Sequence, residues 1–149
     1  MYLRYSCYIV VTVMYIVHSN QIYSCMVYFL VMKHIISSTL YLIILLCLSK
    51  FIFDPTYLYY EIPWLDIPMH VMGGFGVASL VLAVSAYKKK KMTFVSVLLI
   101  YLFIAVGWEV YEFIQDTMNN VSWNGWEDTL SDIANGAIGS SVAYYLLKK

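Results

Sequence analysis

Long apolar stretches alternate with short polar segments along most of the chain. Four of these stretches approach the length of about 20 residues that an α-helix needs to cross a bilayer. They cover residues 35–53, 66–87, 92–114 and 129–147. Helices satisfy their own backbone hydrogen bonds in lipid, so the pattern predicts an all-α, polytopic membrane helix bundle with four transmembrane helices and one additional N-terminal apolar helix.

The N-terminal segment fits this pattern less well than the rest of the chain. The stretch 5–32 is apolar, but the sequence His18-Ser19-Asn20-Gln21 interrupts it near the middle. Residues 1–31 are therefore predicted to be either an extra helix or a segment that is not native to the protein. No small-residue cleavage site marks them as a cleaved signal peptide. Residues 32–149 are predicted to form a single four-helix transmembrane domain.

The composition agrees with lipid as the solvent. Of the 149 residues, 62% are hydrophobic and only 12% are charged, and the mean hydropathy is +0.72. A soluble domain of this size could not bury so much apolar surface. The formal net charge is zero, which leaves no electrostatic basis for binding nucleic acid. The partner predicted from composition is the lipid bilayer.

The charges are separated along the predicted spans. If the four spans alternate in direction, Lys33, Lys88–Lys91 and Lys148-Lys149 all fall on one side. By the positive-inside rule this side is the cytoplasmic face of a bacterial inner membrane. The acidic residues fall at the outer end, where Lys50 is predicted to snorkel or to pair with an acid. The tryptophans also lie there, as in an interfacial belt: Trp64, Trp108, Trp123 and Trp126.

Three of the predicted spans each carry a polar pair whose spacing places both members on one helix face. The pairs are Asp66 and His70, Glu109 and Glu112, and Asp128 and Asp132, with Asn135 three residues beyond the last. Each pair lies near the outer end of its span. We therefore expect the pairs to meet at one depth and to form a polar pocket that opens to the outside.

Several carboxylates in one pocket repel each other, and a cation relieves the repulsion. Carboxylate oxygens together with one imidazole suit Mg²⁺, Mn²⁺, Fe²⁺ or Zn²⁺, and such an ion can polarise a phosphoryl group or activate water. The predicted metal ligands are Asp66, His70, Glu109, Glu112 and Asp132. The candidates for acid–base catalysis are His70, Glu109 and Glu112, and those for binding a substrate are Asp128 and Asn135.

Each of these residues also has a structural interpretation. Asp66 can cap a helix whose first turn contains Pro68, and Asp128 can cap the last helix. A lone histidine such as His70 is more often hydrogen-bonded for stability than a ligand. Carboxylates within spans are rare and favour a functional role for Glu109 and Asp132. The glycines that follow His70 and Asp132 are typical of close helix packing.

The polar pairs form ordered motifs over residues 60–147. The motif D-x3-H opens one span, WE-x2-E closes the next, and D-x3-D-x2-N-x3-G opens the last. The ordered set resembles the VanZ-like proteins and the related YjdF-like inner-membrane proteins. The resemblance implies a multi-pass protein of the cytoplasmic membrane, and the VanZ-like branch is linked to teicoplanin resistance and thus to the cell envelope.

Two positions depart from the VanZ-like pattern. Ile67 stands where those proteins usually have a basic residue after the first aspartate. The stretch NGWEDTLSD lacks the arginine that usually precedes the last D-x2-N motif. These departures weaken the case for a role in resistance.

Three functions are compatible with the sequence. In the first, a metal in the pocket engages a phosphate-bearing headgroup of an envelope lipid, either as an enzyme or as a binding protein. In the second, the acids relay protons or bind a cation during transport. In the third, the polar pairs only hydrogen-bond the bundle together. The sequence does not decide whether the protein is an enzyme.

Overall fold

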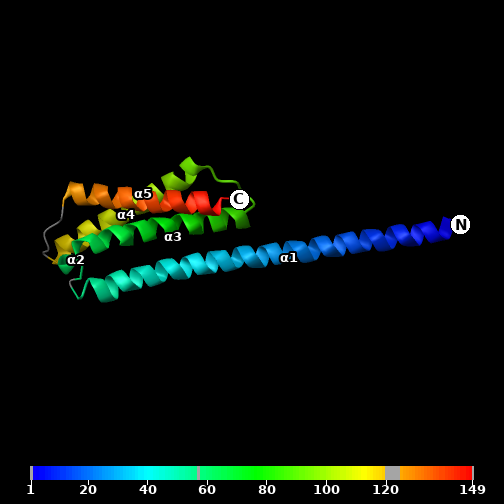
Figure 1. Ribbon diagram of the computed structural model, residues 1–149, viewed down its shortest axis with the longest axis horizontal. Coiled ribbons are helices and arrows are strands. Elements are labelled where there is room, and N and C mark those ends of the chain that lie inside the picture. Colours follow the sequence, from blue (N-terminus) through cyan, green and yellow to red (C-terminus); the bar gives the residue numbers. More distant parts are fainter. Residues whose placement is uncertain (1, 57, 120–124, 149) are drawn as a thin grey trace.

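The computed structural model describes residues 2–56, 58–119 and 125–148, and these residues contain helices and no strands (Figure 1). The predicted all-helical fold is thus confirmed. The elements are α1 (Tyr2–Leu48), the π-helix η1 (Ser49–Phe53), α2 (Leu58–Glu61), the 3-10 helix η2 (Pro63–Leu65), α3 (Asp66–Tyr87), α4 (Phe94–Asn119) and α5 (Trp126–Leu147).

Among the described residues, three helical segments are long and apolar enough to cross a membrane. They are Cys25–Phe53, Asp66–Tyr87 and Phe94–Asn119. The fourth predicted span corresponds to α5, whose 22 residues would reach about 33 Å. It is not among these candidates because Asp132, Asn135 and a series of serines and glycines keep its hydropathy too low. The expected number of four spans is therefore not confirmed by length and composition.

The helix α1 is longer than a membrane span. Its 47 residues extend about 70 Å, more than twice the roughly 30 Å of a bilayer core. The sequence analysis treated 5–32 and 35–53 as separate apolar stretches, but α1 runs from the first into the second and passes through the polar residues 18–21 without interruption. Figure 1 shows its N-terminal part projecting beyond the other helices. Tyr28 lies level with the end of α3, where its ring contacts Tyr87 at a centroid distance of 6.1 Å.

Local sequence explains where the other long helices begin. The N-cap of α3 is Leu65, with no side-chain capping bond, so Asp66 does not cap α3 as the structural interpretation proposed. Thr93 caps α4, because its hydroxyl accepts a hydrogen bond from the Ser96 amide at 3.2 Å. Gly125 precedes α5 with a φ of 100°, which only glycine adopts without strain. Asp128 therefore lies inside the first turn of α5 and not at its cap.

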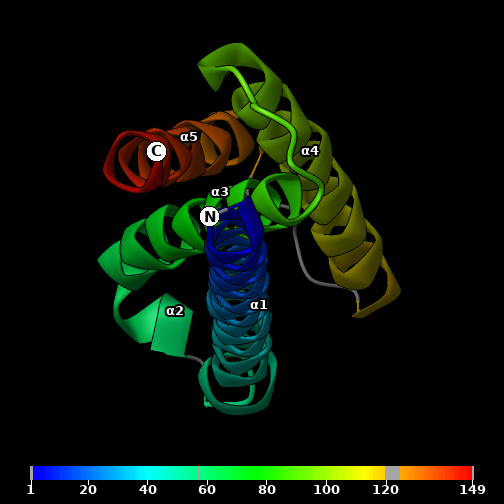
Figure 2. The ribbon, with the colours of Figure 1, turned by 90° about the vertical axis from the view of Figure 1, so that its right-hand side faces the viewer.

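The helix α3 lies between α1 and α5 in the bundle (Figure 2). Its closest packing is against α5, where backbones approach each other at glycines. A methyl group at Gly74 would overlap the carbonyl of Gly136, and one at Gly139 would overlap the carbonyl of Val71. Small residues at such positions allow the close approach that helix pairs in membranes depend on. The packing role predicted for the glycines is thus confirmed.

The two ends of the bundle differ in chemistry. The buried apolar cluster of Ala78, Val97, Ala143 and Tyr144 lies toward the end that carries Lys88–Lys91 and Lys148, which we call the lysine end. The opposite end, where α1 finishes and α3 and α5 begin, is called the acidic end. The Tyr101 hydroxyl, between the two ends, donates to the Ile133 carbonyl at 2.9 Å and ties α4 to α5. The predicted separation of lysines from acids therefore exists in space.

Candidate functional site

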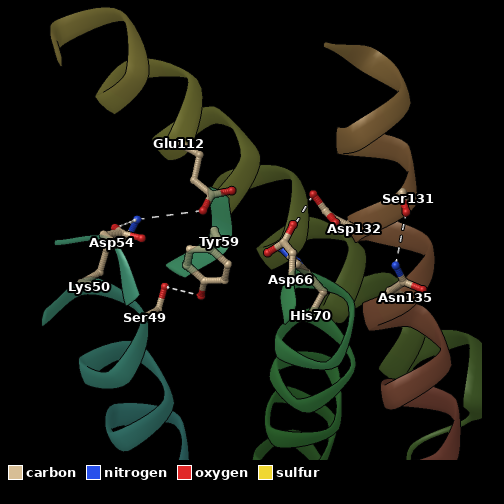
Figure 3. Close-up of polar contacts among 10 residues, drawn as sticks. All are labelled: Ser49, Lys50, Asp54, Tyr59, Asp66, His70, Glu112, Ser131, Asp132 and Asn135. Carbon is tan, nitrogen blue, oxygen red and sulfur yellow. Dashed lines mark hydrogen bonds and ion pairs between the residues drawn. The ribbon is translucent and has the colours of Figure 1, made fainter. Parts of the chain in front are cut away.

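Polar side chains from α3 and α5 meet at the acidic end of the bundle (Figure 3). Nε2 of His70 lies 3.3 Å from Oδ1 of Asp66 and 3.7 Å from Oδ2 of Asp132. The first contact follows from the i, i+4 spacing on α3, and the second from the close packing of α5 against α3. The Asp132 side chain is only 7% exposed and that of His70 16%. The imidazole is thus held between two carboxylates and shielded from solvent.

The glutamates of α4 complete a larger group around the same histidine. One donor atom each from Asp66, His70 and Asp132 lie within 4.8 Å of one another, and the same holds for His70, Glu109 and Glu112. We call these five residues the His70 cluster. The five residues predicted as metal ligands therefore form two groups that share His70, and they come from three different helices.

The spacing within each of the two groups of three residues is close to what one ion requires. Ligands about 2.1 Å from a bound Mg²⁺ lie at most about 4.2 Å apart, so the three donor atoms of a group, which lie within 4.8 Å of one another, need only small movements to share an ion. Four carboxylates and one imidazole also form a donor set that suits Mg²⁺, Mn²⁺, Fe²⁺ or Zn²⁺. The residues present thus fit the predicted cation.

The His70 cluster faces a cavity of about 650 Å³, within the range of roughly 300–1,000 Å³ that small-molecule sites occupy. Asp128, predicted to bind a substrate, lines this cavity. Asn135, the other predicted substrate-binding residue, is not among the lining residues. Its amide donates to the Ser131 hydroxyl at 3.3 Å on the same helix. The structure therefore brings Asp128 to the site but not Asn135.

Lys50 belongs to η1, lines the cavity and faces α4. Its Nζ is 3.0 Å from Oδ2 of Asp54 and 4.0 Å from Oε1 of Glu112, so the predicted pairing of Lys50 with an acid is confirmed. The ammonium also lies over the rings of Trp108 and Tyr111, 5.3 Å and 5.5 Å from their centroids. The contact with Asp54 follows from the i, i+4 spacing of the two residues, but the contacts with α4 depend on how the helices pack.

Tyr59 is a cavity residue that the sequence analysis did not identify. It comes from the short helix α2, and its hydroxyl donates to the Ser49 hydroxyl at 3.0 Å. Burial raises the pKa of the Tyr59 phenol to about 12, so this group stays neutral and able to donate a hydrogen bond at physiological pH. No periodic signal pointed to it, because it lies in the connection between two spans.

The tryptophans agree with an interface at the acidic end. Trp64 and Trp126 are 66% and 72% exposed there, as expected for a belt at the membrane surface. Trp108 instead lines the cavity beside Lys50. Trp123 lies outside the described residues, so its predicted place in the belt stays a prediction.

The long apolar helices and their exposed hydrophobic side chains define an integral, multi-pass membrane protein. Residues 3–149 match the model of a family described as "Predicted membrane protein (DUF2238)", and the chain belongs to this family. No curated protein and no solved structure gives a significant match. The family match includes most of segment 1–31, whose two interpretations stay open.

Proposed function

We propose that the protein holds a divalent cation in the His70 cluster and uses it to bind or to act on the phosphate-bearing headgroup of an envelope lipid. It would do so as a VanZ-like or YjdF-like protein of a bacterial cytoplasmic membrane. The observation that carries the proposal is the convergence of five donor residues from three helices on one cavity.

The electrostatics of the His70 cluster favour a bound cation. Its four carboxylates surround a single imidazole, and the Lys50 ammonium approaches only one of them, Glu112, at 4.0 Å. Charges of one sign repel strongly in a partly buried site, where the effective dielectric constant is far below that of water. A divalent ion would neutralise much of this charge. Function is also the default explanation for ionisable residues within membrane spans.

A cation in the His70 cluster would be the group that activates a ligand in the cavity. When bound, it would polarise a phosphoryl oxygen or lower the pKa of a water molecule. His70, Glu109 and Glu112 are the candidates for moving a proton, and Asp128 lines the cavity where a headgroup would lie. The same arrangement serves a binding protein and an enzyme, and the proposal includes both.

The two alternative functions differ in what supports them. A structural role draws on the contacts of His70 with Asp66 and Asp132, since an imidazolium between two carboxylates would tie α3 to α5. A transport role needs polar groups along the whole path. The cavity lining toward the lysine end is instead apolar, with Val77, Leu80 and Val81, which favours a binding site over a proton or ion path.

Thermal melting of the detergent-purified protein tests the cation. Addition of Mn²⁺ or Zn²⁺ is expected to raise the melting temperature, because an ion that binds only the folded state stabilises it by mass action. At about 100 times the dissociation constant the gain is about 2.7 kcal/mol, which corresponds to a shift of several degrees. An equal ionic strength of NaCl is the control. A shift that NaCl reproduces, or none at all, would support the structural role.

We also propose that α5 crosses the membrane as a fourth span. Its buried face carries the residues that make its composition polar, including Asp132, Gly136, Gly139 and Ser140. Its exposed face is mainly apolar beyond the first turns, where Glu127 and Ser131 are exposed. Leu130, Ile138 and Tyr145 are 63%, 57% and 70% exposed. A helix whose polar residues face its neighbours and whose apolar residues face outward is suited to lipid.

With α5 as a span, the lysine end faces the cytoplasm by the positive-inside rule. Reporter fusions after Lys91 and after Lys149 are expected to show cytoplasmic activity, and a fusion after Asn119 is expected to show activity on the outside. This orientation is expected because Lys88–Lys91 and Lys148 lie at one end of the bundle and the acids lie at the other. Outside activity at both lysine positions would reverse the orientation and place the cavity on the cytoplasmic side.

A further inference from the structure

The cavity extends well beyond the His70 cluster. Its lining residues on α3 begin with Asp66 and end with Val81, a distance of about 22 Å along the helix. The polar residues Asp66 and His70 occupy only the first part of this length. Beyond them the lining positions Val77, Leu80 and Val81 share one helix face by their spacing. The cavity therefore has a polar part at the acidic end and an apolar part that reaches past the middle of α3.

The opposing wall from α1 repeats this division. Leu42, Leu45 and Leu46 line the apolar part, and Ser49 and Lys50 follow one turn later at the polar part. The spacing again places all five on one helix face. Two helices thus present matched stripes, apolar toward the lysine end and polar at the acidic end. An amphiphile has the same division along its length.

The remaining wall comes from α4, at Ile104, Ala105 and Trp108. Within the described residues, α1 packs closely on α3, and α4 packs closely on α5 and α3, but α1 and α4 are not a closely packed pair. In Figure 2, α1 lies below α3 and α4 lies to the right of it. The apolar part of the cavity lies between α1 and α4, and its surroundings in a bilayer are hydrocarbon chains.

The polar part has a group suited to a phosphate. The Lys50 side chain is 27% exposed. Its ammonium donates to Asp54, which leaves donors for another acceptor. The faces of Trp108 and Tyr111 help to hold it at the mouth. Hydrogen bonds from an ammonium to phosphate oxygens are among the stronger ones in proteins. Charge complementarity thus favours an anionic headgroup next to Lys50 once a cation occupies the His70 cluster.

We infer that the cavity takes one hydrocarbon chain of a phosphate-bearing lipid, which enters from the bilayer between α1 and α4, with the lipid phosphate at Lys50. This inference rests on the proposed function and adds to it the ligand class, the entry path and the phosphate-binding residue. A water-soluble phosphate would use the polar part alone. It would leave the matched apolar stripes of α1 and α3 without an occupant.

The inference is tested by native mass spectrometry of the full chain in detergent with Mn²⁺. The probes are dioleoylphosphatidate, dioleoylglycerol, which lacks the phosphate, and inorganic phosphate, which lacks the chains. We expect the wild type to bind dioleoylphosphatidate at least about tenfold more tightly than either of the others. Lys50→Met is expected to remove the preference for dioleoylphosphatidate over dioleoylglycerol.

Two variants place a bulky side chain in the apolar part. Leu46→Trp and Val77→Trp are each expected to weaken dioleoylphosphatidate binding by at least about tenfold while leaving inorganic phosphate binding unchanged. Leu46 is 45% exposed and so tolerates a larger side chain. Phe103→Trp is the matched control, because Phe103 is 83% exposed on α4 and does not line the cavity.

The result separates this inference from the proposed function. If the two cavity variants bind dioleoylphosphatidate as tightly as the Phe103→Trp control, the chain does not lie between α1 and α4 and the inference is wrong. A wild type that binds inorganic phosphate as tightly as dioleoylphosphatidate also overturns it. Mn²⁺ binding is measured on the same samples. Its absence in the wild type would overturn the proposed function, whatever the lipids do.

Discussion

Replacing His70 with alanine is expected to abolish the rise in melting temperature with Mn²⁺ and to weaken Mn²⁺ binding by about 100-fold or more. His70 belongs to both groups of donor atoms, one with Asp66 and Asp132 and one with Glu109 and Glu112. Its loss therefore removes the residue that the two groups share. Loss of a group that only orients a ligand already costs about 10–100-fold in affinity, and loss of the ligand itself should cost more.

His34→Ala provides the control for this substitution. His34 is exposed on α1 and does not line the cavity, so its variant should bind Mn²⁺ as the wild type does. Glu109→Gln adds a second comparison, because it removes one negative charge but preserves shape. In a metal site this variant should lose affinity, whereas in a purely structural cluster it should be mild. Equal Mn²⁺ responses of His70→Ala and His34→Ala would rule out His70 as a ligand.

Replacing Gly139 with alanine is expected to cost about 1–3 kcal/mol of stability and to lower the melting temperature by several degrees. The added methyl group would overlap the Val71 carbonyl and crowd the Phe75 amide. Backbone cannot move aside as a flexible side chain can, so α5 must shift away from α3. Because Asp132 is carried by α5 and His70 by α3, Mn²⁺ affinity should fall together with stability.

Gly107→Ala is the matched control for this prediction. A methyl group at Gly107 would meet no other atom within 4 Å, and alanine is favoured over glycine within a helix by about 1 kcal/mol. This variant should therefore be as stable as the wild type or slightly more stable. Should Gly139→Ala melt at the same temperature as Gly107→Ala, the close backbone contact between α3 and α5 would be contradicted.

The helices were largely predictable from the sequence, because hydropathy and length are properties of contiguous residues. The span predicted at 66–87 matches α3, and the one at 129–147 lies within α5. The stretches 5–32 and 35–53 were predicted separately, whereas α1 runs from one into the other. Ser19, Asn20 and Gln21 are polar, but a helix accepts them at a small cost in propensity, so the helix continues through them. Four spans were predicted, and α5 does not qualify by composition because composition averages over both of its faces.

The His70 cluster was predictable because helical spacing and depth both follow from position in the chain. Asp66 and His70, for example, lie on one face of α3 because they are four residues apart. Both lie at the acidic end because they are in the first turns of that helix. Contacts made across helices were not predictable in this way. Tyr59 comes from a short connecting helix, and Lys50 reaches Glu112 only because η1 lies beside α4. Asn135 lies about 10 Å farther along α5 than Asp128. There the Ser131 hydroxyl accepts a hydrogen bond from the Asn135 amide.

Cation binding by His70 together with carboxylates can be observed at the metal itself. Pulsed electron paramagnetic resonance of Mn²⁺ added to the purified protein measures this directly, because the nitrogen nucleus of a bound imidazole couples to the electron spins of the metal. We expect bound Mn²⁺ with a nitrogen coupling in the wild type, retained in His34→Ala and absent in His70→Ala. Free Mn²⁺ alone, or bound Mn²⁺ whose nitrogen coupling survives His70→Ala, would contradict cation binding by His70.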